Sequence, residues 1–340
     1  MTADLALLEH APIALAPVLI FLAVLVHADS YKLLSLRTVL LLVSAGVAAA
    51  GVSYFVSSYA YAHFAGNFAR FSREVSPWIE EALKAAVLVF LIRTRRVGLP
   101  VDAGIAGFAI GTGFALVENL YYLTSRPEIS LPVQIIRGFG TAIMHGGTST
   151  MLAMISVSLY ERRPTAGWQL LVPGFLAAVA MHTAYNFMLL RPALATLTML
   201  IALPLVIYLV FQQSESTLRD WLDQDSDSKL QLLSAITSGQ FLDSPAGRYL
   251  RSLSDRFQGE DLVDMLCLLR LHGELALRAK GVLLLRESGL EVPPLDEATR
   301  DKLAELGQLE RSIGKTGMLM LRPLMMATGK DQWQLHLLDR

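Results

Sequence analysis

The feature that most constrains the fold of this chain is a series of seven long apolar segments. They lie at residues 11–27, 34–57, 77–93, 101–124, 132–159, 168–190 and 193–212. About 20 apolar residues in a helix are enough to cross the roughly 30 Å hydrocarbon core of a bilayer. Charged residues make up 17% of the chain, whereas average soluble domains contain about 25%. The sequence therefore predicts an all-α fold, a polytopic membrane helical bundle of about seven transmembrane helices.

The charged residues are concentrated in the last third of the chain. Residues 214–340 carry 16 Lys and Arg and 20 Asp and Glu, in stretches with helical periodicity that Pro293 and Pro294 interrupt. This change in composition predicts a domain boundary near Gln213. We expect a transmembrane domain at residues 1–213 and a soluble helical domain at residues 214–340, with a regulatory or oligomerising role.

The basic residues of the loops give the orientation in the membrane. One side is expected to carry Lys32, Arg37, Arg93, Arg95, Arg96, Arg162 and Arg163, and the other Arg70, Arg73, Arg126, Arg137 and Arg191. The side with more Lys and Arg usually faces the cytoplasm. The count therefore predicts a multi-pass protein of the cell membrane with an external N-terminus and a cytoplasmic C-terminal domain.

The overall charge excludes one class of partner. The net charge is −1, and the basic residues form no run or stripe of the kind that neutralises nucleic-acid phosphates. Cys267 is the only cysteine, so an intramolecular disulfide is excluded, and no CxxC or Cys/His tract indicates a structural zinc site. The sequence predicts no nucleic-acid binding.

Four groups of polar residues interrupt the apolar segments. They are Glu80, Glu81 and Lys84 in the third, Glu118 and Asn119 in the fourth, His145 in the fifth, and His182 and Asn186 in the sixth. A carboxylate near the centre of a bilayer costs roughly 2.5 to 3.5 kcal/mol, so acidic residues inside a span are functional candidates. Successive spans run in opposite directions, and their residue offsets place all four groups at a similar depth in the outer half of the membrane. The sequence predicts that they share one site.

These residue types suit the hydrolysis of a peptide bond. Histidine nitrogens and carboxylate oxygens are zinc ligands, and a further carboxylate can take the proton of the attacking water. The candidate ligands are His145, His182 and Glu118, and Asn186 is a candidate donor to the oxyanion of a tetrahedral intermediate. The HExxH motif of the common zinc proteases is absent.

Some of these residues also have a structural interpretation. Glu80 and Lys84 are four residues apart and can form an ion pair at the mouth of a helix, with Ser76 as N-cap and Pro77 at the first helical position. For Lys84 we favour this role. A single polar residue in a span often makes only a packing hydrogen bond.

Four glycines in the fourth segment have spacings that favour close helix contact. They are Gly104, Gly107, Gly111 and Gly113. Small residues at such spacing let two membrane helices approach each other closely. We predict that these glycines pack against neighbouring helices rather than bind a nucleotide.

The polar groups resemble the motifs of the PrsW family of intramembrane proteases, which are related to the CAAX prenyl proteases and the bacteriocin-processing membrane proteases. Residues 80–84 match EExxK, residues 114–119 match FxxxEN and residues 182–186 match HxxxN, while His145 stands alone in the span between. In the CAAX relatives the second motif ends in His and the first usually carries Arg. Glu118 and Lys84 therefore favour the PrsW branch.

The resemblance implies an intramembrane endopeptidase in which Glu81 or Glu80 activates water. Glu81 is the first choice. His145, His182 and Glu118 would bind zinc or polarise the scissile carbonyl, and Asn186 would assist, so that zinc-assisted and metal-free glutamate mechanisms both stay open. The implied substrates are single-span membrane proteins of the anti-sigma-factor type, cut near the outer face.

A non-enzymatic function uses the same residues differently. Intramembrane Glu and His side chains also form proton relays, so a proton- or ion-coupled transporter or a membrane scaffold is the alternative. Transporters often contain inverted repeats, and the seven segments show no convincing internal repeat. The sequence therefore favours the protease.

Overall fold

The computed structural model describes residues 2–29, 34–125, 130–162, 168–254, 257–321, 323–325, 333 and 335–338. The regular elements of these residues are all helices, which confirms the predicted all-α class. The chain divides into two compact units, Met1–Ser214 (unit 1) and Glu215–Arg340 (unit 2). The boundary falls inside a long helix, α9 (Pro192–Thr237).

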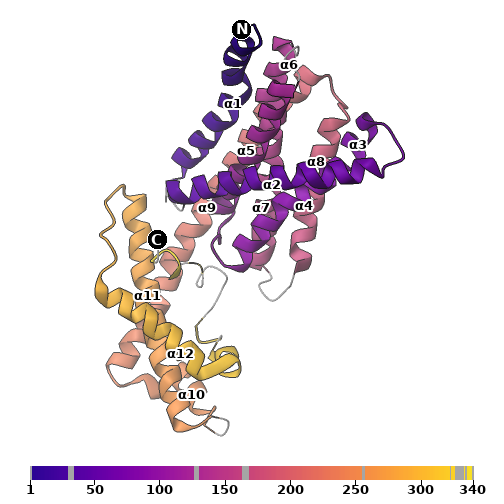
Figure 1. Ribbon diagram of the computed structural model, residues 1–340. Coiled ribbons are helices and arrows are strands. Elements are labelled where there is room, and N and C mark those ends of the chain that lie inside the picture. Colours follow the sequence, from indigo (N-terminus) through magenta and orange to yellow (C-terminus); the bar gives the residue numbers. More distant parts are fainter. Residues whose placement is uncertain are drawn as a thin grey trace. The chain divides into compact units, whose positions relative to one another are not determined.

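The helices of unit 1 follow the predicted segments (Figure 1). They are α1 (Thr2–Ala28), α2 (Leu36–Ala62), α3 (Phe68–Glu74), α4 (Ser76–Arg93), α5 (Pro100–Ser125), α6 (Leu131–Ile136), the π-helix η1 (Arg137–Thr141), α7 (Ala142–Arg162), the 3₁₀-helix η2 (Trp168–Leu171), α8 (Val172–Asn186) and the first part of α9. Three of the loop residues used to predict the orientation, Lys32, Arg126 and Arg163, lie outside the described residues. The orientation therefore stays a prediction.

Among the described residues, five helical stretches are long and apolar enough to cross a membrane. They are His10–Ala28, Leu36–Ala62, Pro100–Ser125, Leu131–Tyr160 and Pro192–Ser214. The predicted number was seven, and the other two segments correspond to α4 and α8. Helix α4 has 18 residues with several charges among them, and α8 has only 15 residues. The protein is thus a multi-pass membrane protein. Its two shorter helices, α4 and α8, contain Glu80, Glu81, Lys84, His182 and Asn186.

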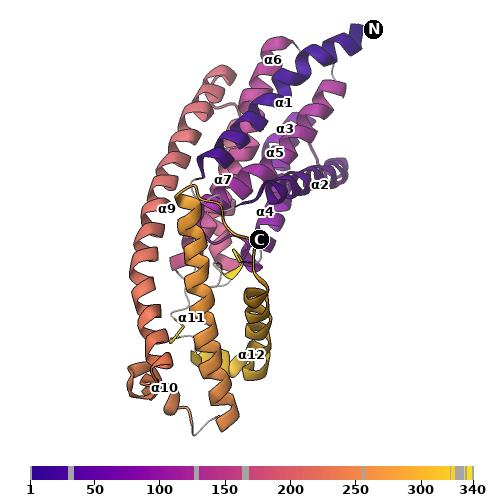
Figure 2. The same ribbon diagram turned by 90° about the vertical axis from the view of Figure 1, so that its left-hand side faces the viewer.

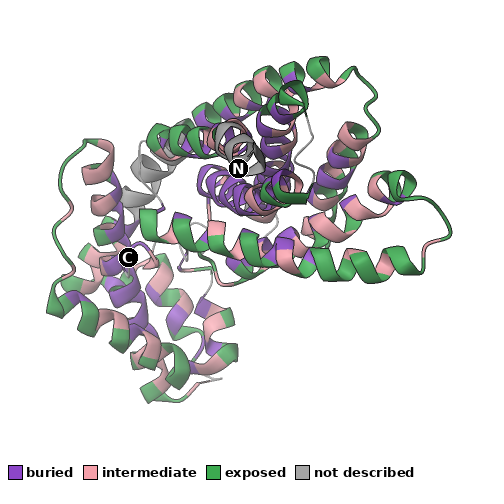
Figure 3. Ribbon diagram, turned by 45° about the horizontal axis from the view of Figure 1, so that its top comes forward, coloured by how far each residue is buried: buried purple, intermediate pink, exposed green. Residues whose placement is uncertain are grey.

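Helix α5 lies at the centre of unit 1, where Figure 3 shows buried residues concentrated. Residues 101–115 of this helix are all buried. A Cβ atom added at Gly107 would lie 2.4 Å from the carbonyl oxygen of Ser149, and one at Gly111 would lie 2.2 Å from that of His145. These contacts confirm the predicted packing role of the glycines, and they hold α7 directly against α5.

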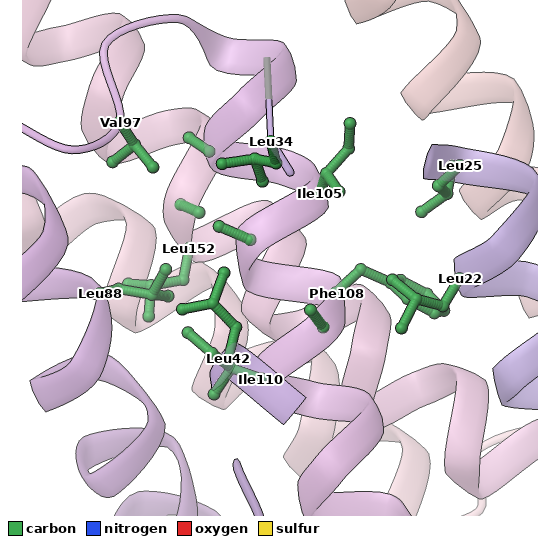
Figure 4. Packing of buried hydrophobic residues seen from close by; sticks show 14 of the residues in the cluster. Leu22, Leu25, Leu34, Leu42, Leu88, Val97, Ile105, Phe108, Ile110 and Leu152 are labelled. Carbon is green, nitrogen blue, oxygen red and sulfur yellow. The ribbon is translucent and has the colours of Figure 1, made fainter. Parts of the chain in front are cut away.

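The apolar core of unit 1 takes residues from α1, α2, α4, α5 and α7 (Figure 4), and also from α8 and α9. It includes Leu22 of α1, Leu42 of α2, Leu88 of α4, Phe108 of α5 and Leu152 of α7. Figure 2 shows α5 and α7 side by side, as their many residue contacts also require. This core fixes the backbone positions from which the polar side chains project.

Unit 2 is helical and has an apolar core of its own. Beyond the end of α9 it contains η3 (Phe241–Asp243), α10 (Pro245–Arg251), α11 (Gly259–Glu287) and α12 (Glu297–Leu321). Residues of α11 such as Met265 and Leu275 pack against Leu306 and Leu321 of α12 in one hydrophobic cluster. Burial of such a cluster accounts for the helical periodicity seen in the sequence.

Candidate active site

Four helices bring the predicted acidic and histidine side chains together inside unit 1. Glu80 and Glu81 come from α4, Glu118 from α5, His145 from α7 and His182 from α8. The helices α4, α7 and α8 contact one another in pairs, and α5 contacts α7 along most of its length. Both histidines and Glu81 are almost fully buried.

The start of α4 sets the position of Glu80. Its N-cap is Val75, whose backbone is not extended, and no side chain caps the helix. The prediction that Ser76 is the N-cap is therefore wrong, because Ser76 already lies in the first turn. The hydroxyl of Ser76 instead donates a hydrogen bond of 2.6 Å to Oε1 of Glu80, one turn further along α4.

Glu81 is at the centre of a buried hydrogen-bond network. Its Oε1 accepts hydrogen bonds from Lys84 Nζ at 2.6 Å, from the Thr148 hydroxyl at 3.0 Å and from His182 Nδ1 at 2.8 Å. The side chains of Glu81 and Lys84 are both 0% exposed. The predicted ion pair of Lys84 with Glu80 is thus replaced by one with Glu81, because Glu81 is the neighbour that faces into the bundle.

Glu80 faces the space between the two imidazole rings. Its Oε2 is buried and has no hydrogen-bond partner. This oxygen lies 3.7 Å from Nε2 of His182 and 4.0 Å from Nδ1 of His145. Ligand atoms of these three residues lie within 4.8 Å of one another, which is close enough for them to hold one metal ion. The third possible ligand in this group is Glu80, whereas the sequence predicted Glu118 in that role.

Glu118 lies on the other side of the His145 ring. Its Oε2 accepts a hydrogen bond of 2.5 Å from His145 Nε2, and its Oε1 accepts one of 3.1 Å from the guanidinium of Arg137. Both carboxylate oxygens are therefore engaged. Phe114, one turn before Glu118 on α5, packs its ring 5.2 Å from that of His145 and 5.0 Å from Lys84 Nζ.

The carboxylates fix the tautomers of the two histidines. An ionised carboxylate only accepts hydrogen bonds, so the ring nitrogen facing it carries the proton. This nitrogen is Nε2 in His145 and Nδ1 in His182. In the neutral rings, Nδ1 of His145 and Nε2 of His182 then present lone pairs to the side on which Glu80 lies.

The two asparagines of the motifs mainly join helices. The side-chain amide of Asn119 donates to the backbone oxygen of Ala14 at 2.8 Å, which links α5 to α1. The amide of Asn186 donates to the backbone oxygen of Ser72 at 3.1 Å, which links α8 to α3. This hydrogen bond of Asn186 therefore involves neither Glu80 nor either histidine.

Two residues of the site were missed in the sequence. Thr148 follows His145 by three residues, a spacing that puts both on one helix face and that was available as a signal. Arg137 was interpreted as a loop residue at the membrane surface. Its side chain is in fact only 13% exposed and is directed at Glu118.

Comparison with known protein families gives one match. The family described as PrsW family intramembrane metalloprotease matches residues 32–210, which is more than half of the chain and includes all of the acidic and histidine residues above. Neither the curated proteins nor the solved structures give a significant match.

Proposed function

Because the chain belongs to the PrsW family of intramembrane metalloproteases, we propose that Glu80 activates the water that hydrolyses a peptide bond of a membrane-protein substrate. The observation that carries this proposal is the buried Oε2 of Glu80, which has no hydrogen-bond partner and lies beside two histidines. A general base must reach the proton of the attacking water directly. Glu80 and Glu81 each have one oxygen without a hydrogen-bond partner, but that of Glu80 lies beside nitrogens of both histidines, whereas the Glu81 carboxylate is held by three hydrogen bonds to its Oε1.

The two histidines would orient the attacking water by accepting a hydrogen bond from it. Their unprotonated nitrogens point to the same side as Glu80, so a water can donate one proton to Glu80 Oε2 and the other to one of these nitrogens, which leaves a lone pair for attack. Glu81 and Glu118 act behind the histidines, each holding one ring in a single orientation. Asn186 keeps its predicted role as oxyanion donor, since its amide has a second N–H beside the one bonded to Ser72.

The residues also fit a zinc ion. Two imidazole nitrogens and one carboxylate oxygen are the ligand types of catalytic zinc sites, which leave a fourth position open. In this zinc alternative Glu80 is a ligand rather than the base: Glu80, His145 and His182 would hold the ion, and Glu118 and Glu81 would accept hydrogen bonds from the ligand histidines. When bound, zinc would lower the pKa of a water molecule and polarise the scissile carbonyl. Lys84 Nζ lies 3.4 Å from Nδ1 of His145, and it would have to move away from a cation there.

We further propose that the substrates are single-span membrane proteins of the anti-sigma-factor type. The site is buried among apolar helices, so a substrate segment that is itself apolar can reach it without leaving the membrane. The proposed orientation places the N-terminus outside and unit 2 in the cytoplasm. Unit 2, which contributes none of the acidic or histidine residues of the site, is proposed to regulate the protease or to form oligomers.

The test is cleavage of a tagged substrate by single-residue variants. The full-length protein would be co-expressed with a panel of epitope-tagged single-span membrane proteins, and the fragments would be followed by immunoblotting. Glu80→Gln should reduce cleavage by a factor of about 10² to 10⁴, the usual contribution of a general base. Glu74→Gln is the matched control, since Glu74 lies on α3 in an exposed ion pair with Arg70, and it should cleave like the wild type.

Two results would contradict the proposal. Full cleavage by Glu80→Gln, together with loss in a folded Glu81→Gln variant, would assign the base to Glu81. Proton or solute transport in liposomes without any peptide cleavage would support a transporter instead. Metal analysis of the purified wild type beside a His145→Ala/His182→Ala variant separates the zinc mechanism from the metal-free one.

A further inference from the structure

The helix that carries His145 contains a π-turn just before it. In η1 the backbone N–H of Ala142 donates to the carbonyl of Arg137, five residues earlier. Such turns are rare, and they occur frequently at functional sites. Gly138 and Gly140 of the turn are buried. The turn therefore sits inside the protein, within two helical turns of the proposed site.

The side chain of Arg137 points from this turn into the protein. One guanidinium nitrogen donates to Oε1 of Glu118 at 3.1 Å, and the guanidinium carbon lies 3.6 Å from the centre of the Tyr122 ring. The side chain is 13% exposed. An arginine that serves as an interfacial anchor extends its charged end toward lipid headgroups and water. Arg137 instead directs its charged end to a carboxylate and an aromatic face.

Arg137 is the first member of a chain of contacts that ends at the site. It binds Oε1 of Glu118, and Oε2 of the same carboxylate accepts the hydrogen bond from His145 Nε2. A carboxylate that is held at one oxygen has less freedom to turn at the other. The orientation of the His145 ring, and thus the direction of its Nδ1, depends on where Arg137 holds Glu118.

We propose that Arg137, presented by the π-turn, is a positioning residue for the Glu118–His145 pair. This inference rests on the proposed role of His145 in hydrolysis, and Arg137 acts only through Glu118. The guanidinium suits the role because it is planar, always charged and able to stack on an aromatic ring while it binds a carboxylate. A lysine at the same place would keep the positive charge. It would not stack on the Tyr122 ring, and it would lack the planar set of N–H donors that binds a carboxylate.

Helix α1 holds the turn in place. A Cβ atom added at Gly138 would lie 2.0 Å from the carbonyl oxygen of Ile13, so the two backbones are in direct contact. The amide of Asn119 donates to the carbonyl of Ala14 and, at 3.5 Å, to the carbonyl of Arg137. The described part of α1 precedes residues 32–210, which match the family. A helix outside the matched region thus supports the positioning residue.

The test compares Arg137→Gln and Arg137→Lys with the wild type, as full-length proteins in detergent. Three quantities would be measured: zinc affinity by competition with a chromophoric chelator, kcat and KM for a tagged single-span substrate, and thermal stability. Arg137→Gln should weaken zinc binding by about 10- to 100-fold, the usual effect of losing an outer contact of a ligand histidine. It should lower kcat by a similar factor, while KM stays within about twofold, because Arg137 does not touch the substrate.

Arg137→Lys should recover part of both losses, and Arg70→Gln is the matched control. Arg70 forms an exposed ion pair with Glu74 on α3, so its loss should change neither zinc affinity nor kcat. Wild-type kcat and zinc affinity in a folded Arg137→Gln variant would overturn the proposal. A fall in thermal stability with kcat unchanged per folded molecule would also overturn it, since a merely structural ion pair behaves that way. If Arg137→Gln does not fold, Arg137→Lys decides the question. A lower kcat and a weaker zinc affinity than in the wild type, at unchanged KM, support the proposal. Unchanged kcat and zinc affinity overturn it.

Measurements on the wild-type protein distinguish a failure of the proposed hydrolysis from a failure of the role proposed for Arg137. A wild-type protein that cleaves without binding zinc removes only the metal mechanism, and the division between kcat and KM then decides the role of Arg137. A wild-type protein that neither cleaves nor binds zinc overturns the proposed hydrolysis itself, and the role of Arg137 with it.

Discussion

The buried ion pair of Glu81 and Lys84 supports this site, although its burial costs free energy. Both side chains are completely buried and 2.6 Å apart. Removing two charges from water is expensive, and the pair is tolerated because Thr148 and His182 supply further hydrogen bonds to the carboxylate. The pair thus ties α4 to α7 and α8, the three helices that carry Glu80 and the histidines.

Lys84→Met should therefore destabilise the protein strongly. The change leaves the Glu81 carboxylate buried without its cation, for which about 3–5 kcal/mol is typical. Thermal or denaturant unfolding of the detergent-solubilised protein would measure the effect. Arg70→Met breaks an exposed pair and should cost less than about 1 kcal/mol. Equal losses for the two variants would contradict the role given to the buried pair.

At this scale the sequence could identify the set of polar residues but not their individual contacts. Glu80 and Glu81 are neighbours in the chain, and on a helix their side chains point about 100° apart. Which one faces Lys84 depends on how α4 is rotated against α7 and α8. That rotation follows from the packing of many apolar residues, so the sequence contains no local signal that chooses between Glu80 and Glu81 as the base.

At the scale of the helices, close contact between α5 and α7 is the feature that places His145. The contact depends on glycines of α5, of which Gly111 lies against the carbonyl of His145 itself. The glycine spacing was sufficient to predict that α5 packs closely against neighbouring helices, but not that α7 is the partner. The π-turn has no signal in the sequence, and its Gly138 packs against the backbone of Ile13, which is distant in the chain.

Gly111→Ala should disturb both folding and cleavage. The new methyl group would lie 2.2 Å from a backbone oxygen, which cannot move aside without shifting α7. Gly51→Ala on α2 is the matched control, since nothing lies within 4 Å of its added Cβ. The control should be neutral or stabilising by up to about 1 kcal/mol, because alanine favours helix. Unfolding curves and substrate cleavage of both variants would check this, and wild-type behaviour of Gly111→Ala would contradict it.

At the scale of the whole molecule, the acidic and histidine residues of the site all belong to unit 1. The family match also ends at residue 210, before unit 2 begins. Deleting residues 220–340 should therefore leave the membrane part folded and able to cleave a tagged substrate. A truncated protein that inserts and folds but cleaves nothing would show that unit 2 is needed for catalysis.

The stability of unit 2 should fall in acid. Burial acts to raise the pKa of Glu274, but hydrogen bonds from Lys302 and Arg270 outweigh it, so the pKa lies below its ordinary value of 4.5. A group whose pKa is lower in the folded state stabilises it above the unfolded pKa, and this stabilisation is lost as the pH falls through the folded pKa. Denaturation curves between pH 3 and 7, read from a fluorophore on the exposed Cys267 of α11, would measure it. Glu274→Gln should reduce the slope below pH 4.5, and an unchanged slope would count against this role.

The π-turn also determines how the side chains of α7 are oriented around the helix axis. A π-turn in an α-helix is equivalent to the insertion of one residue, and each residue of an α-helix advances the side chains by about 100°. If Arg137–Thr141 kept its five residues but formed a regular α-helix, α7 would be turned by about that angle relative to α6. His145 would then leave the face that meets Glu118. The π-turn thus takes up one extra residue while His145 stays on the face that meets Glu118.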